Sequence, residues 1–271
     1  MLLPALDLLK CVQGRHNEPI NNTGFMNYKK LLIPPFIVLI IIVTWLNPLI
    51  RPYWDTLDLK TFNFLNSWVH HSSFWQNFWA FTGHRIMDWI HDIIMFLFFF
   101  FSIKWAAEGL KMRKVAELIF SILFIALIIC MVNGLLFPEF IHMPRKSPTM
   151  VDKEAFRLGT VIDWIKVKDH SRKSFPGDHA TTATLFTCLI FHLMGKRMGF
   201  IAILYAIFFC LPRLIAGAHW LTDNLIGSAS IAIVATSLAF GTPFANWVIT
   251  GIERGLNRLR RKADGEGLRG L

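Results

Sequence analysis

The chain has 271 residues, of which 54% are hydrophobic, and its mean hydropathy is +0.46. This composition excludes an ordinary soluble domain of this size and indicates a polytopic membrane protein. The formal net charge of +10 does not indicate nucleic-acid binding, because the basic residues form short clusters between apolar runs, as the positive-inside rule predicts. The four cysteines have no paired spacing, so neither a disulfide framework nor a thiolate metal site is indicated.

The N-terminal part of the chain is polar and leads into a first membrane span. Residues 1–25 are expected to form a polar extension without the charged region and apolar core of a cleavable signal peptide, and two starts of translation, Met1 and Met26, stay open. The apolar run at 31–50 is long enough to cross a hydrocarbon core of about 30 Å at about 1.5 Å per residue. Residues 51–82 are rich in aromatic side chains but interrupted by charges, which predicts helices lying in the membrane interface.

The second predicted span covers 86–105 and carries Asp88, His91 and Asp92 on its first turns. These groups either face the bundle interior or lie among the lipid headgroups. Four further apolar runs predict spans at 115–137, 179–194, 200–216 and 219–240.

The predicted fold is therefore an all-α bundle of six transmembrane helices, with interfacial helices in its first periplasmic segment. We expect residues 26–250 to form one catalytic domain and residues 251–271 to form a basic cytoplasmic tail. Six spans put both termini on one side, and that side holds the larger share of Lys and Arg. The termini are thus predicted to be cytoplasmic, with the polar loop at 138–178 in the periplasm of a bacterium.

The chemistry of the chain is predicted at two segments about forty residues apart. Ser171–Ala180 combines basic residues, a Pro-Gly turn and His179 immediately before an apolar run. In the second segment, His219 and Asp223 are spaced i and i+4, so on a helix both side chains would lie on one face. The carboxylate could then accept the proton of one imidazole nitrogen and leave the other free as a nucleophile. The alternative is a hydrogen-bonded pair that only stabilises a helix end.

Three basic segments are expected to meet at the outer ends of the third, fourth and fifth spans. Arg213 can present a planar fork to phosphate oxygens, and Arg145 with Lys146 adds a further basic cluster. At the start of the fourth span, free backbone N–H groups and the helix dipole favour an anion. His179 is placed there to act as general acid and base, whereas Asp178 is either a helix N-cap or a selector of the acceptor. Cations gathered around two histidines favour phosphoryl transfer.

These segments resemble a known family. Arg145 with Ser147-Pro148, then Ser174-Phe-Pro-Gly-Asp-His179, then Arg213-x5-His219-x3-Asp223 resemble the three signature segments of the type 2 phosphatidic acid phosphatase (PAP2) superfamily of membrane lipid phosphatases. The resemblance implies that His219 forms a phosphohistidine, Asp223 orients it and His179 is the acid and base. It also implies no metal or other cofactor, and a set of substrate-binding residues: Arg145, Lys146, Arg172, Ser174, Gly177, Asp178 and Arg213.

The chain also departs from the superfamily pattern. Pro138 stands where the first segment has a lysine, whose role could fall to Lys146, Arg172 or Lys173; Gly177-Asp178 replaces Ser-Gly; and Pro212 replaces a serine. These departures are similar to one branch of the superfamily, which transfers a phosphate from undecaprenyl diphosphate to the 1-phosphate of lipid A in the bacterial inner membrane. A phosphatase that uses water as acceptor, and a non-catalytic membrane binding or assembly protein, remain alternatives. The sequence does not indicate an oligomeric state.

Overall fold

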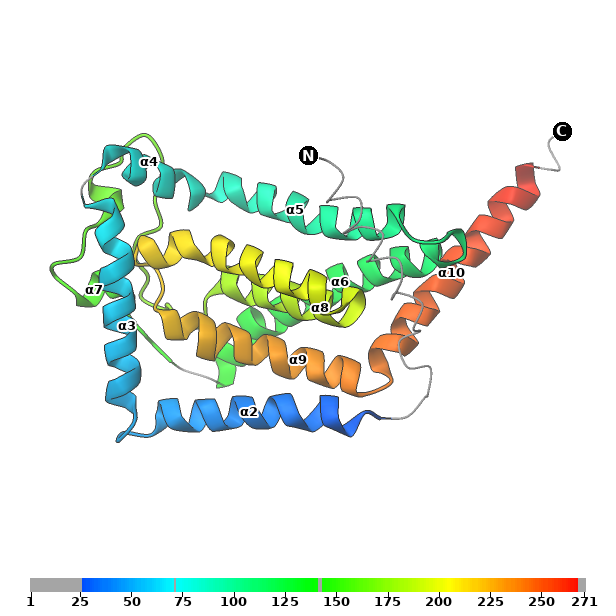
Figure 1. Cartoon of the computed structure of the whole chain (residues 1–271), viewed down its shortest axis with the longest axis horizontal. Coiled ribbons are helices and arrows are strands. Elements are labelled where there is room, and N and C mark those ends of the chain that lie inside the picture. The colour runs from blue at the N-terminus through cyan, green and yellow to red at the C-terminus, as the bar shows by residue number, and fades with distance from the viewer. Residues whose placement is uncertain (1–25, 71, 141–142, 268–271) are drawn as a thin grey trace.

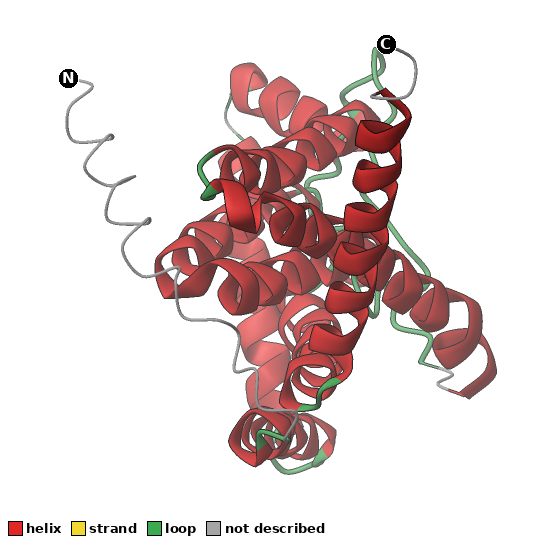
Figure 2. Ribbon diagram, turned by 90° about the vertical axis from the view of Figure 1, so that its right-hand side faces the viewer, coloured by secondary structure: helices red, strands yellow, loops and turns green. Residues whose placement is uncertain are grey.

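The computed structural model describes residues 26–70, 72–140 and 143–267, and every regular element in these ranges is a helix (Figures 1 and 2). The all-α fold class is confirmed, while the predicted extension at 1–25 lies outside the described residues. The α-helices are α2 (Tyr28–Leu46), α3 (Arg51–Asn66), α4 (Ser73–Thr82), α5 (Arg85–Lys104), α6 (Lys111–Met131), α7 (Pro148–Val151), α8 (Asp178–Ile215), α9 (Ala229–Gly241) and α10 (Phe244–Gly267). Shorter 3-10 or π turns are η1 (Ser67–Val69), η2 (Glu108–Leu110), η3 (Val132–Phe140), η4 (Leu158–Thr160) and η5 (Asp223–Ser228).

Among the described residues, five helical stretches are long and apolar enough to cross a membrane, which makes this a multi-pass membrane protein. They are Tyr28–Leu46, Arg85–Lys104, Glu108–Leu136, Asp178–Ile215 and Asp223–Gly241. Large apolar side chains of α2 and α5 are exposed, for example Phe36 at 62% and Ile93 at 59%. Such faces are stable in hydrocarbon and costly in water.

Helix α8 is a hairpin of two antiparallel arms that meet at Gly195. Gly195 has a φ of 82°, a conformation that costs other residues about 1 kcal/mol or more. Near the turn, the hydroxyl of Thr187 donates to the carbonyl of Ala202 at 3.1 Å, and at the far end Arg213 reaches His179. The predicted reversal after Met194 is therefore present, although the second arm begins directly after Gly195. The count of six spans stays a prediction.

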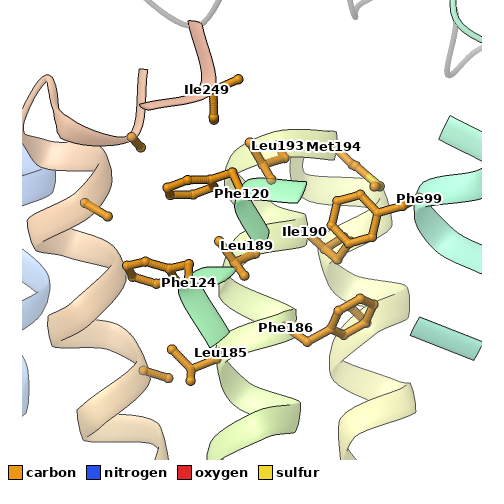
Figure 3. Packing of buried hydrophobic residues seen from close by; sticks show 14 of the residues in the cluster. Phe99, Phe120, Phe124, Leu185, Phe186, Leu189, Ile190, Leu193, Met194 and Ile249 are labelled. Carbon is orange, nitrogen blue, oxygen red and sulfur yellow. The ribbon is translucent and has the colours of Figure 1, made fainter. Parts of the chain in front are cut away.

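The core joins α6, α8 and α9 in the middle of the bundle (Figure 3). Leu185, Leu189 and Leu193 follow one another at helical spacing on α8, and the rings of Phe120 and Phe124 on α6 pack against them. Phe186 on the neighbouring face is 1% exposed. Because this arm of α8 is buried along its length, the residues at its start are held on a rigid support.

Helix α3 lies crosswise over one end of the bundle, at a steep angle to α2 (Figure 1). Its buried face contains Asp58, Phe62, Leu65 and Asn66. The amide of Asn66 donates to the carbonyl of Ile215 at 2.9 Å, which fastens α3 to the last turn of α8. The crosswise placement agrees with the predicted interfacial helices.

The opposite end of the bundle is closed by the basic helix α10, which packs on α6. Arg113 of α6 donates to Asn246 at 2.7 Å and to Thr250 at 2.8 Å. The predicted boundary of the basic tail at residue 251 falls inside α10, which runs through it without a break. All of the predicted site segments lie at the other end, beneath α3.

Candidate active site

The first two signature segments run side by side below α3. The backbone N–H of Ser174 donates to the carbonyl of Arg145 at 2.8 Å, and the N–H of Ser147 donates to the carbonyl of Ser171 at 2.9 Å. The hydroxyl of Ser147 also accepts from the N–H of Ser171 at 2.9 Å. These bonds hold the segment around Arg145 against the segment that leads to His179, so the two move as one unit.

His219 has one engaged and one free ring nitrogen. Its Nδ1 lies 2.7 Å from the carbonyl oxygen of Ser174. A carbonyl only accepts, so Nδ1 carries the proton and Nε2 keeps its lone pair. Nε2 is buried and has no hydrogen-bond partner among the described residues. The sequence predicted a free imidazole nitrogen, and the structure provides one.

The partner of His219 differs from the prediction. Asp223 Oδ2 is 3.9 Å from Nδ1, too far for a hydrogen bond. The prediction of a helical i, i+4 pair was wrong because His219 precedes the helical residues that carry Asp223, and Asp223 Oδ2 instead accepts the backbone N–H of Trp220 at 2.7 Å. The carboxylate therefore caps the turn and acts on His219 only through space.

The environment keeps the imidazole of His219 uncharged at neutral pH. Burial lowers the pKa of His219 to about 4, and the positive charges of Lys168 and Arg213 act in the same direction. The hydrogen bond to the Ser174 carbonyl opposes this shift without cancelling it. A nucleophilic imidazole must be unprotonated, so the site holds His219 in the reactive form.

Arg145 is held between two buried carboxylates. Its Nη1 donates to Asp223 Oδ1 at 2.6 Å and its Nη2 donates to Asp58 Oδ2 at 2.6 Å. The guanidinium also lies over the rings of Trp220 and Trp45, with distances of 5.4 and 5.8 Å to the ring centroids. Burial would lower the pKa of Arg145, but Asp223 and Asp58 outweigh it and raise the pKa above its ordinary value. The guanidinium is thus permanently charged and fixed in orientation.

Asp58 is a site residue that the sequence reasoning missed. It comes from α3, is 1% exposed, and accepts the backbone N–H of Thr222 at 2.8 Å besides its bond to Arg145. The hydroxyl of Thr222 donates to Asp58 at 2.5 Å and accepts from Arg145 at 2.8 Å. Its spacing could have indicated this role, because Asp58 lies on the same helix face as the apolar Phe62 and Leu65. A carboxylate on a buried face is costly unless it is paired with a cation or hydrogen-bonded.

His179 and Arg213 form the other half of the site. Arg213 Nη2 is 3.0 Å from His179 Nε2, and since a guanidinium only donates, Nε2 accepts and Nδ1 carries the proton. Asp88 Oδ1 lies 3.6 Å from that Nδ1. Of the two alternatives for Asp88, the structure supports the one facing the bundle interior. His91 instead bonds the hydroxyl of Tyr205 at 3.0 Å and packs inside the bundle.

The comparison with known families gives one family match and one curated relative. Residues 114–247 match the PAP2 superfamily. The matched region contains Arg145, His179, Arg213, His219 and Asp223, and the predicted family resemblance is confirmed. The chain is also 27% identical over 231 residues to "Lipid A 1-diphosphate synthase" of Escherichia coli (strain K12), covering 85% of this chain and 94% of that relative. No solved structure matches the chain.

Gly177 and Asp178 stand where this chain differs from the PAP2 pattern quoted above, and Gly217 shapes the turn before His219. Gly177 is the N-cap residue of α8, so of the two alternatives for Asp178 the N-cap is wrong. Asp178 is the first helical residue and is exposed, and its role in selecting the acceptor stays a prediction. A Cβ on Gly177 would lie 2.6 Å from Asn224 Oδ1, which explains the need for glycine. Asn224, which the sequence reasoning missed, has a buried Oδ1 without a partner among the described residues. Gly217, with a φ of 74°, makes the predicted break before His219.

The remaining predicted cations do not reach the site. The side chains of Lys146 and Arg172 are exposed, and only the carbonyl of Lys146 is engaged, accepting from Trp220 Nε1 at 2.8 Å. No group of three described His, Cys, Asp or Glu residues could hold a metal ion. Three cations that were not predicted, Arg85, Lys166 and Lys168, instead line a cleft together with His179 and Arg213.

Proposed function

We propose that this protein is a membrane phosphotransferase that moves a phosphate from undecaprenyl diphosphate to the 1-phosphate of lipid A through a phosphohistidine at His219. The observation that carries the proposal is the free, buried Nε2 of His219, whose ring is fixed by the Ser174 carbonyl. Its neighbours, Arg145 and the His179–Arg213 pair, are the groups that phosphoryl transfer needs. The similarity to a lipid A 1-diphosphate synthase supports the choice of donor and acceptor.

In the first step, Nε2 of His219 attacks the terminal phosphorus of the donor. A P–N bond forms as the P–O bond to undecaprenyl phosphate breaks, and the bonding electron pair leaves on that oxygen. His179 supplies a proton to the leaving oxygen when one is needed. The Nδ1 proton of His219 stays on the ring. The Ser174 carbonyl accepts a hydrogen bond from this N–H and so stabilises the cationic phosphoimidazole.

In the second step, an oxygen of the acceptor phosphate attacks the phosphohistidine. The P–N bond breaks, its electron pair returns to Nε2 of His219, and the new phosphoanhydride bond completes the transfer. Arg145 and Arg213 donate hydrogen bonds to the equatorial oxygens in both steps. Neither step consumes ATP or another co-reactant, since the donor anhydride supplies the free energy.

A lipid substrate is consistent with the position of the site at one end of an apolar bundle. An apolar groove of about 690 Å³ lies between α2, α6 and α9. One end of the groove is lined by Phe244 and the other by Ser230. Ser230 follows Asp223 by seven residues, which is about 10 Å along a helix. A hydrocarbon chain in the groove would therefore keep its phosphate close to His219. We propose that this end of the bundle faces the periplasm of a bacterial inner membrane, with the termini in the cytoplasm.

The test uses the purified full-length protein with undecaprenyl diphosphate labelled at its terminal phosphate, with and without lipid A. We expect label in lipid A 1-diphosphate only when lipid A is present, and an acid-labile label on the protein when it is absent. His219→Ala should remove both signals. Free phosphate produced at the same rate with or without lipid A would replace the transferase with a phosphatase. No label transfer by the wild-type protein would favour the non-catalytic alternative.

A further inference from the structure

The cleft lined by Arg85, Lys166 and Lys168 opens beside His179 and Arg213. It has a volume of about 470 Å³ and lies between the first turn of α5 and the loop around Lys166 and Lys168. His179 and Arg213 line it as well, so it joins the site on the side of the proposed general acid. Its volume falls within the range of about 300–1,000 Å³ that is usual for small-molecule sites.

The cleft has an excess of positive charge. Its lining includes four permanent cations, Arg85, Lys166, Lys168 and Arg213, and one carboxylate, Asp88. Such an excess favours an anion, and lysine and arginine are the side chains that commonly bind a phosphate group.

Three of these cations have no internal partner. Arg85, Lys166 and Lys168 are exposed and make no hydrogen bond or close ion pair with any described residue. Arg157, in the same loop, differs, because it pairs with the buried Asp169 at 3.3 Å. Burial would raise the pKa of Asp169, but its bonds to His170, Arg157 and Gly159 hold it below its ordinary value. That carboxylate is therefore already satisfied and leaves the lysines uncompensated.

Lys168 acts electrostatically on His219. The charge of Lys168 is one of the influences that lower the pKa of His219, after burial. A phosphate bonded to His219 and an anion bound at Lys168 would consequently interact electrostatically, as adjacent phosphates of a diphosphate do. Arg213 contacts His179 and lines the cleft, and its charge also acts on His219.

We propose that this cleft binds a second phosphate: that of the leaving lipid phosphate in the first step and that of the acceptor in the second. The inference rests on the proposed function. In-line displacement puts the leaving group and the later acceptor on the same side of the transferred phosphorus, opposite His219. The cleft lies on the side of His179, the proposed acid and base for that group. Water or a neutral alcohol would gain nothing from three extra cations.

A binding experiment on His219→Ala protein tests the cleft without turnover, with inorganic diphosphate and inorganic phosphate as probes. We expect diphosphate to bind more tightly than phosphate. In Lys166→Ala/Lys168→Ala protein, diphosphate affinity should fall by about 100-fold, since each lost hydrogen bond between charged groups is worth at least roughly tenfold. Lys166→Arg/Lys168→Arg should restore binding. Lys153, exposed in the same loop but outside the cleft, provides the matched alanine control.

Two results would overturn the cleft proposal: no preference for diphosphate over phosphate in the His219→Ala protein, or a diphosphate affinity that the lysine variant leaves unchanged. Turnover distinguishes the two lipid sources. A slower burst of undecaprenyl phosphate identifies the leaving phosphate, and a raised KM for lipid A identifies the acceptor phosphate. If the wild-type protein transfers no phosphate, the proposed function fails whatever the binding data show. If transfer occurs and the lysine variant retains its preference for diphosphate, only the cleft proposal fails.

Discussion

Replacing Asp58 by Asn is the most direct test of how Arg145 is positioned. Asn keeps the shape of Asp and can still accept a hydrogen bond from the Thr222 N–H. It loses the negative charge, however, and places an N–H donor against Arg145 Nη2, which in the wild-type protein lies 2.6 Å from a carboxylate oxygen of Asp58. Breaking a buried ion pair costs about 3–5 kcal/mol. Because Asp223 still bonds Arg145 Nη1, we expect the free energy of unfolding to fall by the lower value, about 3 kcal/mol. The rate of phosphoenzyme formation should fall about 10- to 100-fold, as displacement of a positioning group by about 1 Å does.

The measurements are the free energy of unfolding in mixed micelles and single-turnover formation of the phosphoenzyme. Asp55→Asn is the matched control: it lies one turn earlier on α3, is 52% exposed and stands 3.9 Å from Arg145. Such an exposed pair contributes at most about 1 kcal/mol, so this variant should resemble the wild type. If Asp58→Asn has wild-type stability and rate, or if both variants lose the same amount, the buried carboxylate does not position Arg145.

Three further predictions concern the segments around the nucleophile. Gly217→Ala should lower the free energy of unfolding by about 2–4 kcal/mol in a denaturant titration, because its φ is 74° and a Cβ would lie 2.5 Å from Thr149 Cγ2. Since the pKa of His219 is about 4 in the folded state and ordinarily 6.5, the unfolded chain binds the extra proton between these pH values. The contribution of His219 to the free energy of unfolding should therefore fall by about 3 kcal/mol from pH 6.5 to 4, and His219→Gln should lessen the measured fall by that amount. Gly177→Ala should slow single-turnover transfer at least tenfold, and Asn224→Ala in the same chain should restore part of the rate; strict additivity would refute their contact.

The spans and the signature residues were predictable because each depends on a local pattern. Apolar runs of membrane length gave the helices of the bundle within a few residues, and composition alone excluded a soluble fold. Arg145, His179, Arg213 and His219 were found because cations and histidines stood next to apolar runs. Their convergence at one end of the bundle follows from the alternating direction of successive spans.

The contacts within the site were not predictable from spacing. The His219–Asp223 prediction assumed a helix that begins before His219, whereas the turn at Gly217 delays it, so a backbone carbonyl from another segment takes the imidazole proton. Asp58 lies 87 residues before Arg145, and no local rule relates them. Similarly, Lys166 and Lys168 belong to an irregular loop, in which the direction of a side chain depends on the whole path of the chain.

The two carboxylates on Arg145 also affect how the product leaves. Of the five N–H groups of Arg145, bonds to Thr222, Asp223 and Asp58 use three, so a phosphate can bond the guanidinium only through the remaining two and competes there with the charge of two buried carboxylates. A phosphate bonded covalently to His219 stays beside Arg145 despite this competition, whereas free inorganic phosphate must overcome it with hydrogen bonds alone. The resting arginine is thus already neutralised, and the site should resist product inhibition in a medium rich in phosphate.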